Sequence, residues 1–125
     1  MEYLRCEIFA DEPERAVRFY RDVLGFHVER DDRDATGYVS MRRGAVVLGV
    51  GRGSALESTV ARRPPIGVEL VLVVDDVLAA RDRVVAYGWP LDEDLVSRPW
   101  GLSDFRVLDP DGYYWRVTEE SPHPA

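Results

Sequence analysis

The sequence predicts an α+β fold made of two tandem βαβββ modules. Two amphipathic helical stretches begin about half a chain length apart, and the same order of strand-like runs surrounds each of them. The chain has 125 residues, of which 46% are hydrophobic. This length and composition fit a single domain, residues 1–125, that can bury a core.

The first helical stretch runs from Asp11 to Leu24, with apolar residues at helical spacing. Asp11 is placed to accept a hydrogen bond from a free N–H group of the first turn. Pro13 is tolerated there because first-turn N–H groups have no partner in the helix. Gly25 follows at the position where a left-handed residue commonly ends a helix.

The second helical stretch repeats this pattern. Asp75 and Asp76 open it, apolar residues recur along it from Val77, and Gly88 closes it. The repeat predicts that the two halves of the chain fold in the same way.

The strands are expected on both sides of each helix, as alternating or apolar runs. Residues 4–9 precede the first helix, and residues 26–30, 38–42 and 45–50 follow it. Residues 67–74 precede the second helix, and residues 91–96, 102–108 and 113–118 follow it. A turn at Asp109-Pro110-Asp111-Gly112 separates the last two runs. Module 1 is therefore expected over about 1–51, a linker over about 52–65 and module 2 over about 66–120.

Composition excludes several classes of protein. The net charge of −7 argues against nucleic acid as a partner, since phosphate binding needs a basic face. One cysteine excludes a disulfide framework, and two histidines, His27 and His123, restrict metal chemistry. The chain has no apolar run long enough to span a membrane, and its first residues lack the pattern of a signal peptide. We therefore expect a cytoplasmic protein that contacts no membrane.

Several motifs carry a resemblance to a known family. They are the run from Arg18 to Phe26, the segment Val74-Asp75-Asp76-Val77, Pro99-Trp100-Gly101 with Asp104-Phe105, and the turn from Asp109 to Gly112. The chain resembles the vicinal oxygen chelate superfamily, which includes glyoxalases, extradiol dioxygenases and bleomycin-resistance proteins. The resemblance implies mixed sheets that curl around a cavity, and a homodimer. The Pro-Trp-Gly segment points to the bleomycin-resistance branch.

The resemblance also identifies the positions at which superfamily enzymes hold their metal. Counted from the helix starts and turn glycines, these positions are Arg5, Leu48, Glu69 and Arg116. Two guanidiniums, one carboxylate and one aliphatic side chain do not form a metal site, because Arg stays protonated and has no lone pair to donate. We expect no metal, no other cofactor and no catalytic residue.

Strand alternation places these residues independently. Arg5 and Glu7 share one face of the first strand, and Tyr114 and Arg116 share one face of the last. We hypothesise that Glu69 pairs with Arg116 or with Arg5 where a metal would otherwise lie. The alternative is a purely structural cluster of ion pairs.

The sequence therefore predicts a metal-independent binding protein for a small molecule, resembling antibiotic-sequestering proteins of the bleomycin-resistance type. Its ligand is expected to be cationic or aromatic. The predicted ligand-binding residues are Arg5, Glu7, Tyr38, Leu48, Glu69, Trp100, Tyr114 and Arg116. Two alternatives stay open: a lyase, isomerase or dioxygenase on the same fold, and an interaction module whose cavity has no ligand.

Overall fold

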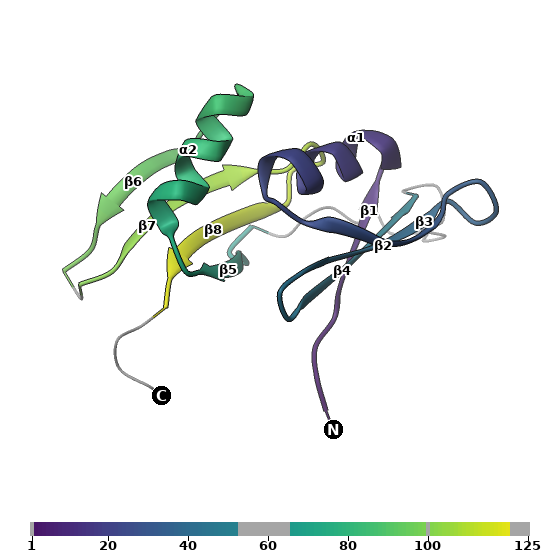
Figure 1. Cartoon of the computed structure of the whole chain (residues 1–125), viewed down its shortest axis with the longest axis horizontal. Coiled ribbons are helices and arrows are strands. Elements are labelled where there is room, and N and C mark those ends of the chain that lie inside the picture. The colour runs from purple at the N-terminus through teal and green to yellow at the C-terminus, as the bar shows by residue number, and fades with distance from the viewer. Residues whose placement is uncertain (1, 53–65, 100, 121–125) are drawn as a thin grey trace. The chain divides into compact units, whose positions relative to one another are not determined.

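The structure, a computed structural model, describes residues 2–52, 66–99 and 101–120. The chain forms two compact units, Met1–Arg63 and Pro64–Ala125, each built on one mixed sheet (Figure 1). The predicted linker over 52–65 lies almost entirely outside the described residues.

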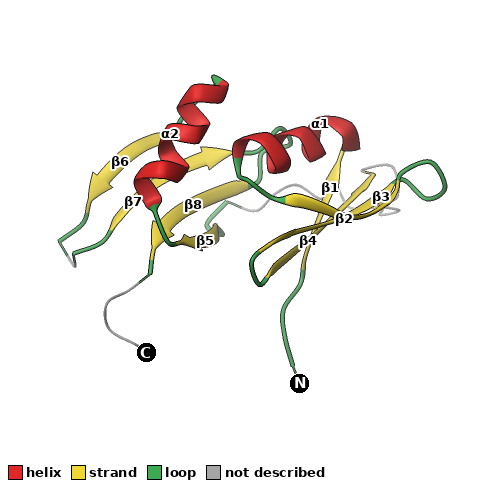
Figure 2. Cartoon of the chain, viewed as in Figure 1, coloured by secondary structure: helices red, strands yellow, loops and turns green. Residues whose placement is uncertain are grey.

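Unit 1 has the predicted order of one strand, one helical segment and three strands. Its elements are β1 (Cys6–Ala10), α1 (Pro13–Arg18), the π-helical turn η1 (Phe19–Val23), β2 (His27–Asp32), β3 (Tyr38–Arg43) and β4 (Val46–Arg52). The strands lie in the order β1-β4-β3-β2, with β1 parallel to β4 and the other neighbours antiparallel. Figure 2 shows the helical segment in red and the strands in yellow.

The core of unit 1 lies between α1 and one face of the sheet, where α1 packs against β1, β3 and β4. Ile8, Met41 and Leu48 are fully buried there. Tyr20 packs edge to face against Phe19 and Phe26, at centroid distances of 5.0 and 5.8 Å. These rings close the end of the helical segment over the core.

The first helix begins later than the sequence predicts. Its N-cap is Glu12 rather than Asp11, and the Glu12 side chain makes no capping hydrogen bond. Pro13 occupies the first turn, where the missing N–H costs no hydrogen bond. Gly25 has a φ of 77°, which confirms the predicted left-handed residue after the helix.

Unit 2 repeats the order of unit 1. Its elements are β5 (Leu70–Val74), α2 (Val77–Tyr87), β6 (Glu93–Ser97), β7 (Ser103–Leu108) and β8 (Tyr114–Glu119). The strands lie in the order β5-β8-β7-β6, with β5 parallel to β8. The sequence-based prediction of two βαβββ modules is therefore confirmed, including all eight strands.

Local signals in unit 2 act as the sequence predicts. The Asp76 carboxylate accepts a hydrogen bond of 2.9 Å from the Ala79 N–H and caps α2, and Gly88 ends the helix at a φ of 90°. In the β7–β8 turn, Asp109 Oδ1 accepts hydrogen bonds from the backbone N–H groups of Asp111 and Tyr113. Asp109 is thus a turn residue.

Each sheet has a second face that no described helix of its own unit covers, and this face is called the open face below. In unit 2, α2 packs against β6, β7 and β8, over a core that includes Phe105 and Trp115. The side chains that alternate with this core, such as Val71 and Arg116, lie on the open face. Within the described ranges no helix is long and apolar enough to cross a membrane.

Candidate functional site

A network of charged side chains lies on the open face of unit 2. It joins three arginines and three carboxylates from β6, β7 and β8, the residue before β5 and the residue after β6. Its members, called the Asp104 cluster below, are Glu69, Glu93, Arg98, Asp104, Arg106 and Arg116.

The sheet register brings these residues to one face. Arg106 on β7 lies opposite Arg116 on β8 and opposite Glu93 on β6. Glu69 stands one residue before β5, whose Val71 is the register partner of Arg116. Because side chains alternate along a strand, all of these groups project from the open face.

Two arginines hold the three carboxylates of the cluster. Arg98 donates to Asp104 Oδ1 from Nε at 3.0 Å and from Nη2 at 2.8 Å, and its Nη2 also donates to Glu93. Arg106 donates to Glu69 from Nε at 3.1 Å and to Glu93 from Nη1 at 3.2 Å. Such charge-assisted bonds are among the strongest side-chain contacts in proteins.

Asp104 is the buried centre of this cluster, with its side chain only 1% exposed. Burial would raise the pKa of Asp104. The hydrogen bonds from Arg98 and the positive charges of Arg106 and Arg116 outweigh that effect, so the pKa is lowered. Asp104 is therefore an anion whose charge is balanced by arginines.

Arg116 makes contacts of a different kind. Its Nε lies 3.1 Å from Glu69 Oε1, and its Nη1 lies 3.6 Å from Asp104 Oδ2. The predicted pairing of Glu69 with Arg116 is therefore confirmed. Neither contact is aligned as a hydrogen bond, and both Arg116 Nε and Asp104 Oδ2 are buried without a hydrogen-bond partner in the described part of the chain.

The open face of unit 1 carries a smaller polar cluster. The Tyr38 hydroxyl donates to the Glu7 carboxylate at 2.9 Å, and Arg5 donates to the same carboxylate. Burial and the hydrogen bond to Glu7 raise the pKa of Tyr38. Arg5, the alternative partner considered for Glu69, is thus paired with Glu7 within unit 1.

Gly49 on β4 makes room for this cluster. It lies opposite Glu7 in the β1–β4 register, and a Cβ atom there would stand 1.7 Å from Glu7 Oε2 and 2.3 Å from the Tyr38 hydroxyl oxygen. The Glu7–Tyr38 hydrogen bond therefore needs a residue without a side chain at this position.

The prediction that Leu48 lines the ligand face is wrong. Leu48 is fully buried in the core of unit 1, where it pairs with Cys6 and Met41. The internal repeat shows the correct position, because Glu7 pairs with Gly49 as Val71 pairs with Arg116. The shift is one residue, which moves a side chain to the opposite face of a strand.

Two further predicted residues have aromatic side chains. Tyr114 lies on the open face of unit 2, and its hydroxyl donates to Asp92 at 2.5 Å. That hydrogen bond and burial raise the pKa of Tyr114 to about 12. Trp100 lies outside the described residues, as does His123.

Sequence reasoning missed four members of the Asp104 cluster: Arg106, Asp104, Arg98 and Glu93. Glu93 falls within the strand predicted over 91–96 but was not assigned to a site; it begins β6 and pairs with Arg98 and Arg106. Alternation along residues 102–108 places Asp104 and Arg106 on one face. The same argument that located Arg116 could therefore have found both.

The metal-ligand positions of the superfamily do not fit a metal in this chain. With the correction above they are Arg5, Gly49, Glu69 and Arg116. Only Glu69 offers an oxygen donor, and it already accepts hydrogen bonds from Arg106. Among the described residues, no group of three or more His, Cys, Asp and Glu side chains could hold a metal ion.

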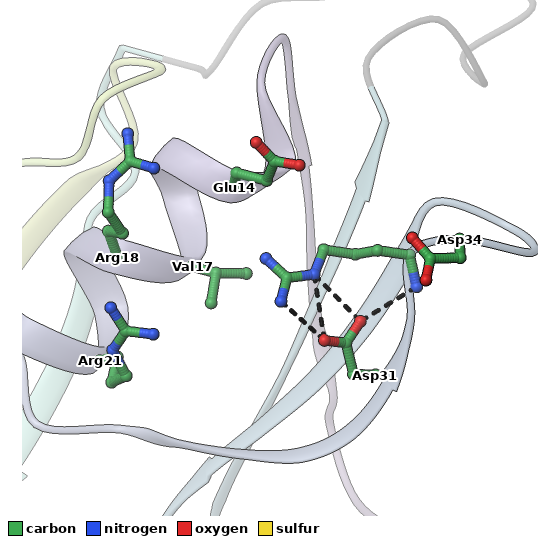
Figure 3. A pocket seen from close by; sticks show the side chains of 7 residues that line it. Glu14, Val17, Arg18, Arg21, Asp31 and Asp34 are labelled. Atoms are coloured by element: carbon green, nitrogen blue, oxygen red, sulfur yellow. Dashed lines mark hydrogen bonds and ion pairs between the residues drawn. The ribbon is translucent and has the colours of Figure 1, made fainter.

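A separate pocket of about 500 Å³ lies in unit 1, beside α1, η1, the end of β2 and the residues that follow it (Figure 3). Its lining includes Val17, Arg18, Asp31 and Arg33. Arg33 and Asp31 are joined by several hydrogen bonds, and Val17 is the only apolar residue among the described residues of the lining. A pocket that holds an organic ligand is usually lined mainly by apolar groups, so we do not place the site here.

The fold and the two open-face clusters define a protein of paired βαβββ units. Residues 3–117 match the family model of the Glyoxalase/Bleomycin resistance protein/Dioxygenase superfamily. The chain belongs to this superfamily, as its motifs indicate.

Solved structures with the same fold include TioX from Micromonospora sp. ML1, at 24% identity and a TM-score of 0.79, covering 95% of this chain and 98% of that chain. A superfamily member from Sphaerobacter thermophilus DSM 20745 is 24% identical, with a TM-score of 0.74 and coverage of 96% and 98%. Lactoylglutathione lyase from Agrobacterium tumefaciens is 22% identical, with a TM-score of 0.74 and coverage of 96% and 94%. These likenesses show the fold alone. No curated protein matches the sequence.

Proposed function

We propose that this chain is a metal-independent binding protein for a small organic molecule, of the bleomycin-resistance type. The observation that carries the proposal is the ion pair between Glu69 and Arg116, with Nε and Oε1 3.1 Å apart. Both residues stand at positions where superfamily enzymes hold a metal. A guanidinium at such a position attracts anionic and hydrogen-bond-accepting groups, whereas it repels a cation.

The chemistry of the open faces favours binding over catalysis. The Glu7 carboxylate, the best placed base in unit 1, already accepts hydrogen bonds from Tyr38 and Arg5. Glu69 and Asp104 are likewise held by arginines. A substrate proton would therefore have to compete with protein donors for the oxygen atoms of these carboxylates.

Apolar and aromatic groups lie beside the charged cluster. Val71 and Val73 on β5 are 44% and 54% exposed, and Tyr114 is half-buried on β8. An apolar surface with a few fixed polar groups is typical of sites that bind small organic molecules. Stoichiometric sequestration of a flat, partly apolar ligand fits this surface.

Calorimetric titration with a panel of naphthalene derivatives tests the proposal: a carboxylate, a neutral amide and a quaternary ammonium compound. All buffers contain EDTA, and NMR follows the ligand for chemical change. Saturable binding of at least one compound in the presence of EDTA, without turnover, supports the proposal. Turnover of a bound compound would contradict it in favour of an enzyme. A complete lack of binding would favour an interaction module without a ligand.

A further inference from the structure

We infer that Arg116 is the anchor for a carboxylate group of the ligand, and that the ligand is a small amphiphilic carboxylic acid. This inference rests on the proposed function, because it takes the open face of unit 2 as the binding surface. It names which charge that surface recognises.

The three arginines of the Asp104 cluster share its hydrogen bonds unequally. Glu69, Glu93 and Asp104 each accept at least one hydrogen bond, and every one of those bonds comes from Arg98 or Arg106. The three carboxylates and three guanidiniums balance in formal charge. Arg98 and Arg106 therefore supply all of these hydrogen bonds, whereas Arg116 is ion-paired with Glu69 and Asp104 without donating a hydrogen bond to either.

The N–H groups of Arg116 make no hydrogen bond within the described part of the chain. Its side chain is 26% exposed, its Nε is buried, and it donates no hydrogen bond to any described residue. Guanidinium groups in proteins normally use their five N–H donors, and a partly buried guanidinium without hydrogen bonds is unfavourable. The buried Nε faces Glu69, so a ligand oxygen on the open face would accept from the terminal Nη groups of Arg116.

The shape and the charge of the Arg116 guanidinium favour a carboxylate as the ligand group that it binds. The planar fork of a guanidinium matches the two oxygen atoms of a carboxylate, and a carboxylate brings less negative charge beside Glu69 and Asp104 than a phosphate does. A cationic ligand would find the cluster carboxylates already bound to arginines, with Arg116 repelling it. The charge of Arg116 therefore selects an anion over a cation.

Two exposed valines of β5 lie beside Arg116 and provide a surface for the apolar part of the ligand. Val71 is the register partner of Arg116, and Val73 follows it on the same exposed face of β5. A ligand whose carboxylate meets Arg116 can lay an aromatic or aliphatic body along these valines, because they share one face of the sheet. The surface thus fits an acid with one charged end and one apolar end.

The test compares naphthoate, naphthamide and naphthylmethyl-trimethylammonium by calorimetric titration of the whole chain. These compounds share the ring and differ in charge. We expect naphthoate to bind at least about tenfold more tightly than naphthamide, and the ammonium compound to bind most weakly. The side-chain N–H resonance of Arg116 should move when naphthoate is added.

Variants separate Arg116 from its surroundings. Arg116→Gln should weaken naphthoate binding by about tenfold or more, and Arg116→Lys should restore part of it because the charge remains. Glu69→Gln should strengthen naphthoate binding, since a negative neighbour of the bound carboxylate is removed. The control is Arg81→Gln, because Arg81 lies on α2 and pairs with Asp94, outside the Asp104 cluster.

The outcomes distinguish the two proposals. Binding of naphthamide or the ammonium compound as tight as that of naphthoate overturns the inference but leaves the binding function standing. An unchanged affinity for naphthoate in Arg116→Gln, with the variant folded by circular dichroism, overturns it as well. Failure of all three compounds to bind overturns both.

Discussion

At the scale of single residues, Gly49 shows how a missing side chain shapes the open face of unit 1. Its φ is not positive, so its role is space rather than backbone conformation. The Glu7 carboxylate and the Tyr38 hydroxyl meet above it, where a methyl group would overlap both. Gly51, two residues along the same strand, has ordinary contact distances of 3.4 Å to Phe9 at its Cβ position.

This pair of glycines makes a controlled prediction. Gly49→Ala should lower the free energy of unfolding by about 1–3 kcal/mol, because the new methyl group pushes Glu7 and Tyr38 apart. Gly51→Ala should change it by less than about 0.5 kcal/mol. Urea unfolding measures both. Equal effects of the two substitutions would show that the Glu7–Tyr38 contact does not depend on the space above Gly49.

Asp104 carries the second prediction at this scale. Asp104→Asn should destabilise the protein at neutral pH by about 3 kcal/mol, because it removes a buried charge that arginines surround. The pKa of Asp104 is lowered by folding. Its contribution is therefore fully present above the unfolded-state pKa of about 3.9 and is lost as the pH falls through the lower folded value.

Urea unfolding of both proteins at a series of pH values measures this effect. The difference in unfolding free energy between wild type and Asp104→Asn should shrink below about pH 4. A difference that stays constant into strong acid would mean that Asp104 is not stabilised as an anion in the folded state.

At the scale of elements, the two helices start with different caps. Asp76 caps α2 with its side chain, whereas Glu12 precedes α1 without a side-chain cap. Asp76→Ala should therefore lower the free energy of unfolding by about 1 kcal/mol, and Glu12→Ala should have almost no effect. Thermal and urea unfolding check both variants. A larger loss in Glu12→Ala than in Asp76→Ala would contradict the assignment of the caps.

The strands and helices were predictable because their signals are local. Apolar alternation marks the strands, and Asp76 and Gly88 mark the ends of α2. The start of α1 was less predictable, since Asp11 and Glu12 are both acidic and only the backbone conformation decides which residue is the cap. Element boundaries generally shift by one or two residues for this reason.

The site was predictable only in part, because it depends on register between strands far apart in sequence. Arg116 and Glu69 were found by counting within a repeated pattern. Leu48 was misplaced because a slip of one residue reverses the face of a side chain. Arg98 was missed because it follows β6, whose register with β7 is irregular between Glu93 and Val96, and no local pattern reveals that irregularity.

At the scale of the whole molecule, one framework repeated within the chain carries two different sets of side chains. Gly49 in unit 1 and Arg116 in unit 2 occupy equivalent register positions, but one provides space and the other a charge. Fold membership therefore does not decide function, which depends on the side chains at these positions. The homodimer expected from the resemblance stays a prediction, and sedimentation velocity can measure it.

The central claim is that an arginine–carboxylate pair stands where superfamily enzymes bind a metal. The most direct test is the metal content of the untagged protein after equilibration with Zn²⁺, Ni²⁺, Mn²⁺ and Fe²⁺ in turn, followed by desalting and elemental analysis. The account predicts far less than one ion per chain for each metal, and the same low content in Glu69→Gln. Retention of one ion per chain by the wild type, lost in Glu69→Gln, would contradict it.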